Sequence, residues 1–74
     1  APKPAWVTVP LDLTHPTAIN LLAGVITTTP GTVSCVVDEE RREIIVHALD
    51  CADPAGMAAQ MKQRYEAPLL EIFG

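Results

Sequence analysis

Basic residues are scarce in this 74-residue chain, which has five lysines and arginines against nine acidic residues and a net charge of −4 at pH 7. The five bases are also scattered along the sequence instead of forming one stripe. A protein that binds nucleic acid needs clustered positive charge to displace the counterions of the phosphates. The charge balance therefore predicts that nucleic acid is not a partner.

Cysteines and long apolar stretches are also lacking. Only Cys35 and Cys51 are present, whereas a secreted domain of this size usually carries about four to eight cysteines. The longest apolar-leaning run, residues 18–26, has about half of the ~18–20 residues that a membrane span needs. We therefore expect one soluble domain at residues 6–74, after a proline-rich linker or trimmed end at residues 1–5.

Hydrophobic residues make up 49% of the chain, too many for a disordered segment. Their spacing predicts a strand, a helix, two strands and a second helix, at residues 6–9, 17–27, 32–37, 44–49 and 55–67. This order predicts an α+β fold, a β-α-β-β-α split sandwich that is ferredoxin-like but lacks the last strand. Its helices should cover one face of a three-stranded antiparallel sheet, with the third strand between the first two.

Prolines mark the expected ends of both helices. Asp12 and Thr14 precede Pro16, and Asp53 also stands just before a proline, so both sites combine a short polar cap with a proline in the first helical turn. Pro68 lacks the N–H that would bond to the preceding helical turn. We therefore expect the second helix to end or bend just before Pro68.

Six charged residues, 38–43, separate the two middle strands and are typical of a solvent-exposed hairpin tip. Symmetric pairing about this tip places two sets of side chains on opposite sheet faces. The more apolar set is expected to face the helices and consists of Val33, Cys35, Val37, Ile44, Val46 and Ala48. The other face carries Val36, Ile45, His47 and Leu49, to which the first strand adds Trp6.

The chain offers little chemistry for catalysis or for a metal site. Cys35 and Cys51 are sixteen residues apart with no Cys-x-x-Cys pattern, and His47 should point to the sheet face opposite Cys35. We interpret Cys35 as a core cysteine, Cys51 as a loop cysteine, and His47 as a strand residue bonded to Ser34. We assign no catalytic, metal-binding or cofactor-binding residue, and we expect no small-molecule substrate.

The most distinctive local motif is Thr29-Pro30-Gly31-Thr32. Proline followed by glycine predicts a tight turn in which Gly31 has a positive φ. A phosphate-binding loop would continue with Gly-Lys-Ser/Thr and a helix, whereas this motif leads into a strand. We therefore interpret the motif as a structural turn.

Three segments together resemble a known family. Residues 26–33 (ITTTPGTV), 45–50 (IVHALD) and 65–73 (YEAPLLEIF) are similar to the E subunits of the multisubunit Na+/H+ antiporters of the Mrp, Mnh or Pha type. In that family a threonine-proline-glycine-threonine turn follows an apolar helix, and a VHALD-like strand and a PLLE-like tail come later. The order and spacing match over roughly residues 6–73.

This resemblance implies a non-catalytic accessory or assembly subunit of a bacterial inner-membrane complex that exchanges Na+ or K+ for protons. The partners would be the other antiporter subunits, and the family's N-terminal membrane helices, which this chain lacks, would attach the protein to the membrane. The chain would then be the cytoplasmic C-terminal domain. The sequence shows no evident buried pair of a carboxylate and a lysine that could carry ions.

A free-standing ferredoxin-like module that binds a small ligand or regulates an enzyme is the alternative, because this fold serves many functions. Under the antiporter hypothesis, we expect a docking face formed by Trp6, Val36, Ile45, His47 and Leu49, or else the unpaired edge of the first strand, to contact another subunit or the membrane surface. The competing interpretation is that the apolar tail, residues 69–73, folds over this face and covers it.

Overall fold

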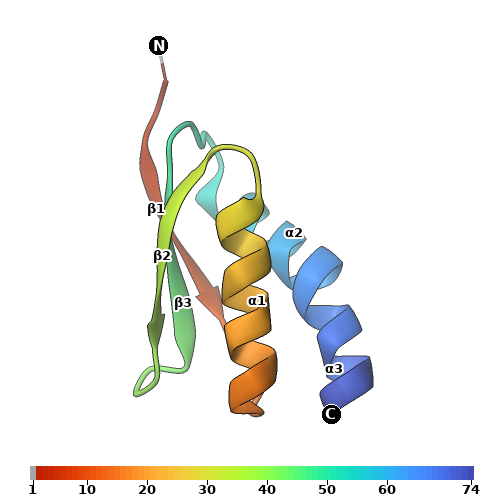
Figure 1. Cartoon of the computed structure of the whole chain (residues 1–74). Helices are drawn as coiled ribbons and strands as arrows, with labels where there is room; N and C mark the ends of the chain where they lie inside the picture. The colour runs from red at the N-terminus through yellow and green to blue at the C-terminus, as the bar shows by residue number, and fades with distance from the viewer. Residues whose placement is uncertain (1) are drawn as a thin grey trace.

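A computed structural model describes residues 2–74, so position 1 of the expected linker lies outside the described part (Figure 1). The elements are β1 (Ala5–Pro10), α1 (Pro16–Thr28), β2 (Thr32–Asp38), β3 (Glu43–Ala48), α2 (Pro54–Met61), the π-helical turn η1 (Lys62–Glu66) and α3 (Ala67–Phe73). The sheet is antiparallel with the strand order β1-β3-β2, which confirms the predicted α+β arrangement. Within residues 2–74, no helix combines the length and the apolar character that crossing a bilayer requires.

The core lies between the sheet and the helices, which all stand on one side of it (Figure 1). Side chains alternate along β3, so that every second residue is fully buried against the helices. From α1, Ala18, Leu22 and Ile26 face this layer at a spacing of four residues, which puts them on one side of the helix. Burial of each large aliphatic side chain contributes about 1.5–3 kcal/mol.

The hairpin of β2 and β3 pairs as expected from its tip to Ser34, which lies opposite His47. Beyond this point a bulge shifts the register, and Thr32 pairs with Ala48 where Val33 was expected. Since the extra residue of a bulge does not follow the alternation of the strand, Val33 leaves the helix side and is 52% exposed. The expected place of Val33 in the core was therefore wrong.

The two helices start differently. Asp53 caps α2 as expected, because its side chain accepts a hydrogen bond of 3.0 Å from the Gly56 amide. At α1 the capping position is taken by His15, which makes no side-chain capping bond. The expectation that Asp12 and Thr14 cap α1 was wrong, because the Asp12 carboxylate forms an ion pair with the C-terminal helices instead.

The second helix was expected to end or bend just before Pro68, and the structure shows that it does not end there. The chain widens into the π-helical turn η1, in which the Ala67 amide bonds to the Lys62 carbonyl five residues earlier, and α3 then continues to Phe73. In an ordinary α-helix the ring of Pro68 would clash with the Arg64 carbonyl. The wider turn moves this carbonyl away, so the helix passes the proline without ending.

The C-terminal residues pack beside α1 and leave the far side of the sheet uncovered. Leu69, Leu70 and Phe73 lie against the core, and the Phe73 ring is 4.9 Å from the His15 ring at the start of α1. Figure 1 shows α3 in the helical layer, away from the opposite sheet face. The hypothesis that the tail covers that face is therefore wrong.

The turn between α1 and β2 requires glycine. The Thr32 amide donates to the Thr29 carbonyl at 3.2 Å, with Pro30 and Gly31 between them and a φ of +88° at Gly31. This is the geometry of a type II turn, whose third residue needs a positive φ. A Cβ atom at Gly31 would meet no atom within 4 Å, so only the backbone conformation disfavours other residues.

Replacing Gly31 with valine should lower the free energy of unfolding by more than ~1 kcal/mol, because a β-branched residue is strained at positive φ. Urea denaturation of the 74-residue chain, followed by circular dichroism, measures this loss. Gly24→Ala is the matched control: it adds a methyl group in open space on helix α1 and should raise stability by about 0.5–1 kcal/mol. If Gly31→Val were as stable as the parent, the turn would not depend on glycine.

Candidate docking surface

The sheet face opposite the helices carries a group of apolar side chains in contact with solvent. We call it the open face and define it by the five residues that the sequence singled out, Trp6, Val36, Ile45, His47 and Leu49. Trp6 is 63%, Val36 60% and Leu49 55% exposed, while Ile45 and His47 are half-buried. Contiguous exposed apolar groups on a small protein commonly mark an interaction site.

The strand register brings these residues together. Ile45 on the central strand β3 lies between Thr8 of β1 and Val36 of β2. His47 pairs with Trp6, and the two rings stack with centroids 4.5 Å apart and an interplanar angle of 18°. His47 is half-buried, as expected, but among the described residues its side chain makes no hydrogen bond to the Ser34 side chain, so that part of the expectation was wrong. The stack orients the Trp6 ring, which stays largely exposed to solvent.

The end of the open face nearest the hairpin tip is acidic. Glu43 follows the same alternation along β3 as Ile45, and it pairs with Asp38 of β2. Asp38 accepts a hydrogen bond of 3.0 Å from the Arg41 amide, and the exposed Arg41 guanidinium lies 4.0 Å from its carboxylate. Residues 38–43 contain four acids and two arginines. The open face therefore runs from an apolar, aromatic end to a negatively charged end.

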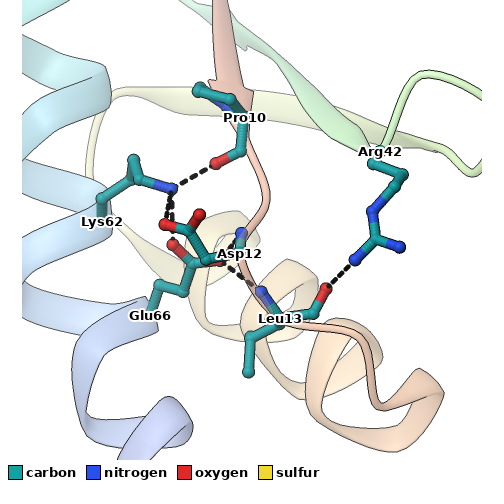
Figure 2. A network of polar contacts seen from close by, with 6 residues as sticks. All are labelled: Pro10, Asp12, Leu13, Arg42, Lys62 and Glu66. Atoms are coloured by element: carbon teal, nitrogen blue, oxygen red, sulfur yellow. Dashed lines mark hydrogen bonds and ion pairs between the residues drawn. The ribbon is translucent and has the colours of Figure 1, made fainter.

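A polar network on the other side of the molecule joins the loop after β1 to the C-terminal helices (Figure 2). The Glu66 side chain is only 1% exposed. Its Oε2 accepts hydrogen bonds from the amides of Asp12 at 2.8 Å and Leu13 at 3.1 Å, and its Oε1 accepts one from Lys62 Nζ at 2.7 Å. This pair, in which the carboxylate of Glu66 is buried and the Lys62 side chain is 28% exposed, was missed in the sequence. The signal in the sequence was the i, i+4 spacing of Lys62 and Glu66.

Lys62 completes this network by contacting three groups. Its Nζ also donates to the Pro10 carbonyl and lies 2.9 Å from the Asp12 carboxylate (Figure 2). Burial alone would lower the pKa of Lys62, but the bonds and charges of Glu66 and Asp12 outweigh it and raise the pKa above its usual value. A raised pKa means that the ammonium contributes stability at neutral pH, which is lost only as the pH rises through that pKa.

Arg42 holds the same loop from the hairpin side. Its carbonyl accepts a hydrogen bond from the Leu11 amide at 2.9 Å, and its guanidinium donates to the Leu13 carbonyl at 3.2 Å. Its φ of +55° is in the left-handed region, which is uncommon for residues other than glycine. Two long-range bonds fix the residue in this conformation. The loop before α1 is thus held by Arg42 on one side and by Glu66 on the other.

The network is suited to structure and not to ion binding. Both Glu66 oxygens are used by donors of this chain, and no buried side-chain polar atom in the described part lacks a hydrogen-bond partner. Residues 2–74 contain no group of three or more histidine, cysteine or acidic side chains that could hold a metal ion. An open groove beside the network is lined by the apolar residues Leu11, Leu13, Pro16, Ile19 and Val37 and by the polar residues Thr14, Asn20, Glu39 and Arg42.

Both cysteines are free thiols. Cys35 is partly buried on the helix side of β2, where its Sγ lies 3.6 Å from the Ala23 carbonyl, and burial raises the pKa of its thiol. Cys51 follows β3 and is buried, with its amide bonded to the Lys3 carbonyl at 2.8 Å. Cys51 thus lies in a loop, as expected, but it is packed against the core.

Comparison with known proteins identifies relatives over nearly the whole chain. A family model described as Na+/H+ ion antiporter subunit matches residues 1–72. The chain is 38% identical over 68 residues to the E subunit of a probable K+/H+ antiporter of Rhizobium meliloti, covering 92% of this chain and 42% of that protein. It is 31% identical over 70 residues to the E subunit of a Na+/H+ antiporter of Alkalihalophilus pseudofirmus, covering 95% of this chain and 44% of that protein.

A third relative shows the same pattern. The E1 subunit of a Na+/H+ antiporter of Staphylococcus saprophyticus is 30% identical over 70 residues, again 95% of this chain and 44% of the relative. The chain therefore spans less than half of the length of the curated relatives that it matches.

Removing the buried carboxylate should strongly destabilise the fold. Glu66→Ala leaves the amides of Asp12 and Leu13 without their acceptor and removes one of the three contacts of Lys62 Nζ, which should cost about 2–4 kcal/mol in the free energy of unfolding. Urea denaturation followed by circular dichroism gives the value. Glu71→Ala, at an exposed position of α3, is the control and should change stability by less than about 0.5 kcal/mol. Equal effects of the two substitutions would show that the network does not support the fold.

The thiols provide a separate test. The denatured and unreduced protein should give two equivalents with a thiol reagent, because neither cysteine is in a disulfide. In the folded chain Cys35 should react more slowly than a free thiol at pH 7–8, because a raised pKa lowers the fraction of reactive thiolate. A count of zero in the monomer would contradict both the hairpin register and the expected reducing compartment.

Proposed function

This chain belongs to the Na+/H+ ion antiporter subunit family, and we propose that it is a non-catalytic assembly domain of a bacterial multisubunit antiporter that exchanges Na+ or K+ for protons. The names of the relatives include both cations, so the proposal covers both. In this role the domain docks another antiporter subunit through the open face. The observation that carries the proposal is the open face itself, which the C-terminal helices leave uncovered.

The state of the charged side chains supports a non-catalytic role. Within residues 2–74, Glu66 is the buried acidic residue, and it is fully bonded to two backbone amides and to Lys62. A carboxylate that relays protons or cations must exchange partners during transport. Releasing Glu66 would break the contacts that hold the loop before α1. The ion path is therefore expected in other subunits.

The charge of the open face favours a protein partner over a lipid surface. Asp38 and Glu43 lie at one end of the face, and the cytoplasmic leaflet of a bacterial membrane carries negative surface potential, which would repel them. A protein partner with basic residues around an apolar patch would match both ends of the face.

We further place this domain on the cytoplasmic side of the inner membrane. Two free thiols fit a reducing compartment, in which disulfides do not persist. Attachment to the membrane would come from the part of the protein that lies beyond this chain, since the relatives are more than twice as long as the matched segment. Membrane helices in that part would anchor the protein within the complex.

A charge in the open face should separate docking from folding. Ile45→Glu should leave the 74-residue chain folded, because the side chain points away from the core, while in the full-length protein it should impair assembly and cation/proton exchange. Circular dichroism tests folding, co-purification of the subunits tests assembly, and dye-monitored proton uptake in membrane vesicles tests exchange. Ile72→Glu is the matched control, because Ile72 is 74% exposed on α3, outside the open face.

Two results would contradict the proposal. If Ile45→Glu unfolds the chain, the face is part of the core and is not a docking surface. If the Ile45→Glu protein assembles and exchanges ions as the Ile72→Glu control does, the open face has no role in the complex.

A further inference from the structure

The occupant of the open face can be specified more closely, and we propose that it is a single amphipathic helix of another antiporter subunit, with basic residues at the end that meets Asp38 and Glu43. This inference rests on the proposed function, because it requires that the face docks another protein of the complex. It adds the secondary structure, the orientation and the charge of the bound element.

The dimensions of the face fit one helix. Three strands spaced about 4.8 Å apart, with six residues of about 3.4 Å each on β3, give a surface roughly 10 Å wide and 20 Å long. An α-helix is about 10–12 Å in diameter, and about 13 residues span 20 Å. The product of these two dimensions, roughly 200 Å², is far below the ~800 Å² of accessible surface that each partner contributes to an interface stable on its own. This face alone would therefore not hold a second copy of the chain. A helix of an assembled complex can dock here, because other contacts of the complex keep it in place.

The edges of the sheet disfavour an added strand. Pro4 precedes the edge strand β1, Pro10 is its last residue, and the Pro10 carbonyl is already bonded to Lys62 Nζ. The other edge strand, β2, is interrupted by the bulge at Val33. Prolines, bulges and covered carbonyls are the devices by which edge strands avoid pairing with another chain. The apolar groups available for contact are therefore on the face and not along the edges.

The two ends of the face set the orientation of the helix. At one end the stacked rings of Trp6 and His47, together with Leu49, offer a broad apolar surface, and tryptophan commonly anchors interfaces. At the other end Asp38 and Glu43 offer negative charge that Arg41 balances only in part. A matching helix has apolar residues three and four positions apart, and lysine or arginine at the end above Glu43.

Site-specific photocrosslinking in the intact complex tests this proposal. A photoreactive amino acid is placed at Val36 or at Leu49 of the full-length protein, and at Gln60 on the exposed side of α2 as the control. The crosslinked peptides are identified by mass spectrometry. We expect Val36 and Leu49 to capture one segment of another subunit, with helical spacing of apolar residues and a basic end, and Gln60 not to capture it.

The other possible occupants are distinct outcomes that would overturn the proposal. These are capture of lipid, capture of a second copy of this chain, capture of a segment without helical spacing, and the absence of any product at both positions. The proposed function has a separate test: it is contradicted if the Ile45→Glu protein assembles normally. If Ile45→Glu blocks assembly but the captured segment is not an amphipathic helix, only the present inference is wrong.

A charge reversal tests the orientation. Glu43→Lys should lower the yield of the Val36 crosslink by roughly fivefold, the effect of losing one partly exposed ion pair and adding repulsion. Glu71→Lys on the helical layer makes the same change in net charge and should leave the yield unchanged. Equal yields for both variants would show that no basic group lies above Glu43.

Discussion

The bonds of the buried Glu66 carboxylate determine how the C-terminal helices pack against the N-terminal part of the domain. They join the C-terminal helices to backbone amides more than fifty residues earlier in the chain. Burying a carboxylate is costly unless its charge is paired and its oxygens are bonded, and here both conditions are met. The α2–η1–α3 segment is thereby held beside α1, and all helices stand on one side of the sheet. The exposure of the opposite face follows from this arrangement.

The π-helical turn η1 and the carboxylate depend on one another. Pro68 makes an ordinary helix unfavourable at this point, and the wider turn relieves the clash while the chain remains helical. Glu66 lies at the end of that turn and Lys62 at its start, where both side chains reach the loop after β1. Pro68 thus does not end the helix, and the turn just before it carries the two side chains, Lys62 and Glu66, that bond to the loop after β1.

Local signals in the sequence predicted the β2–β3 hairpin, the cap at Asp53 and the turn at Gly31. Each of these depends on residues close to one another in the chain. The errors occurred where distant residues decide the outcome. Asp12 is not a helix cap because Lys62 binds it, and the helix passes Pro68 because the turn can widen. The bulge at Val33 is a feature of how two strands pair, and the periodicity of one strand does not reveal it.

The position of Trp6 has a consequence for optical spectroscopy. It is the single tryptophan of the chain, and it remains 63% exposed in the folded state. The indole is exposed to solvent both before and after unfolding, so its emission wavelength is a poor reporter of the loss of structure. Covering the ring with an apolar surface removes that water and shifts the emission to the blue. The native fluorophore therefore reports what lies against the sheet, without any added label.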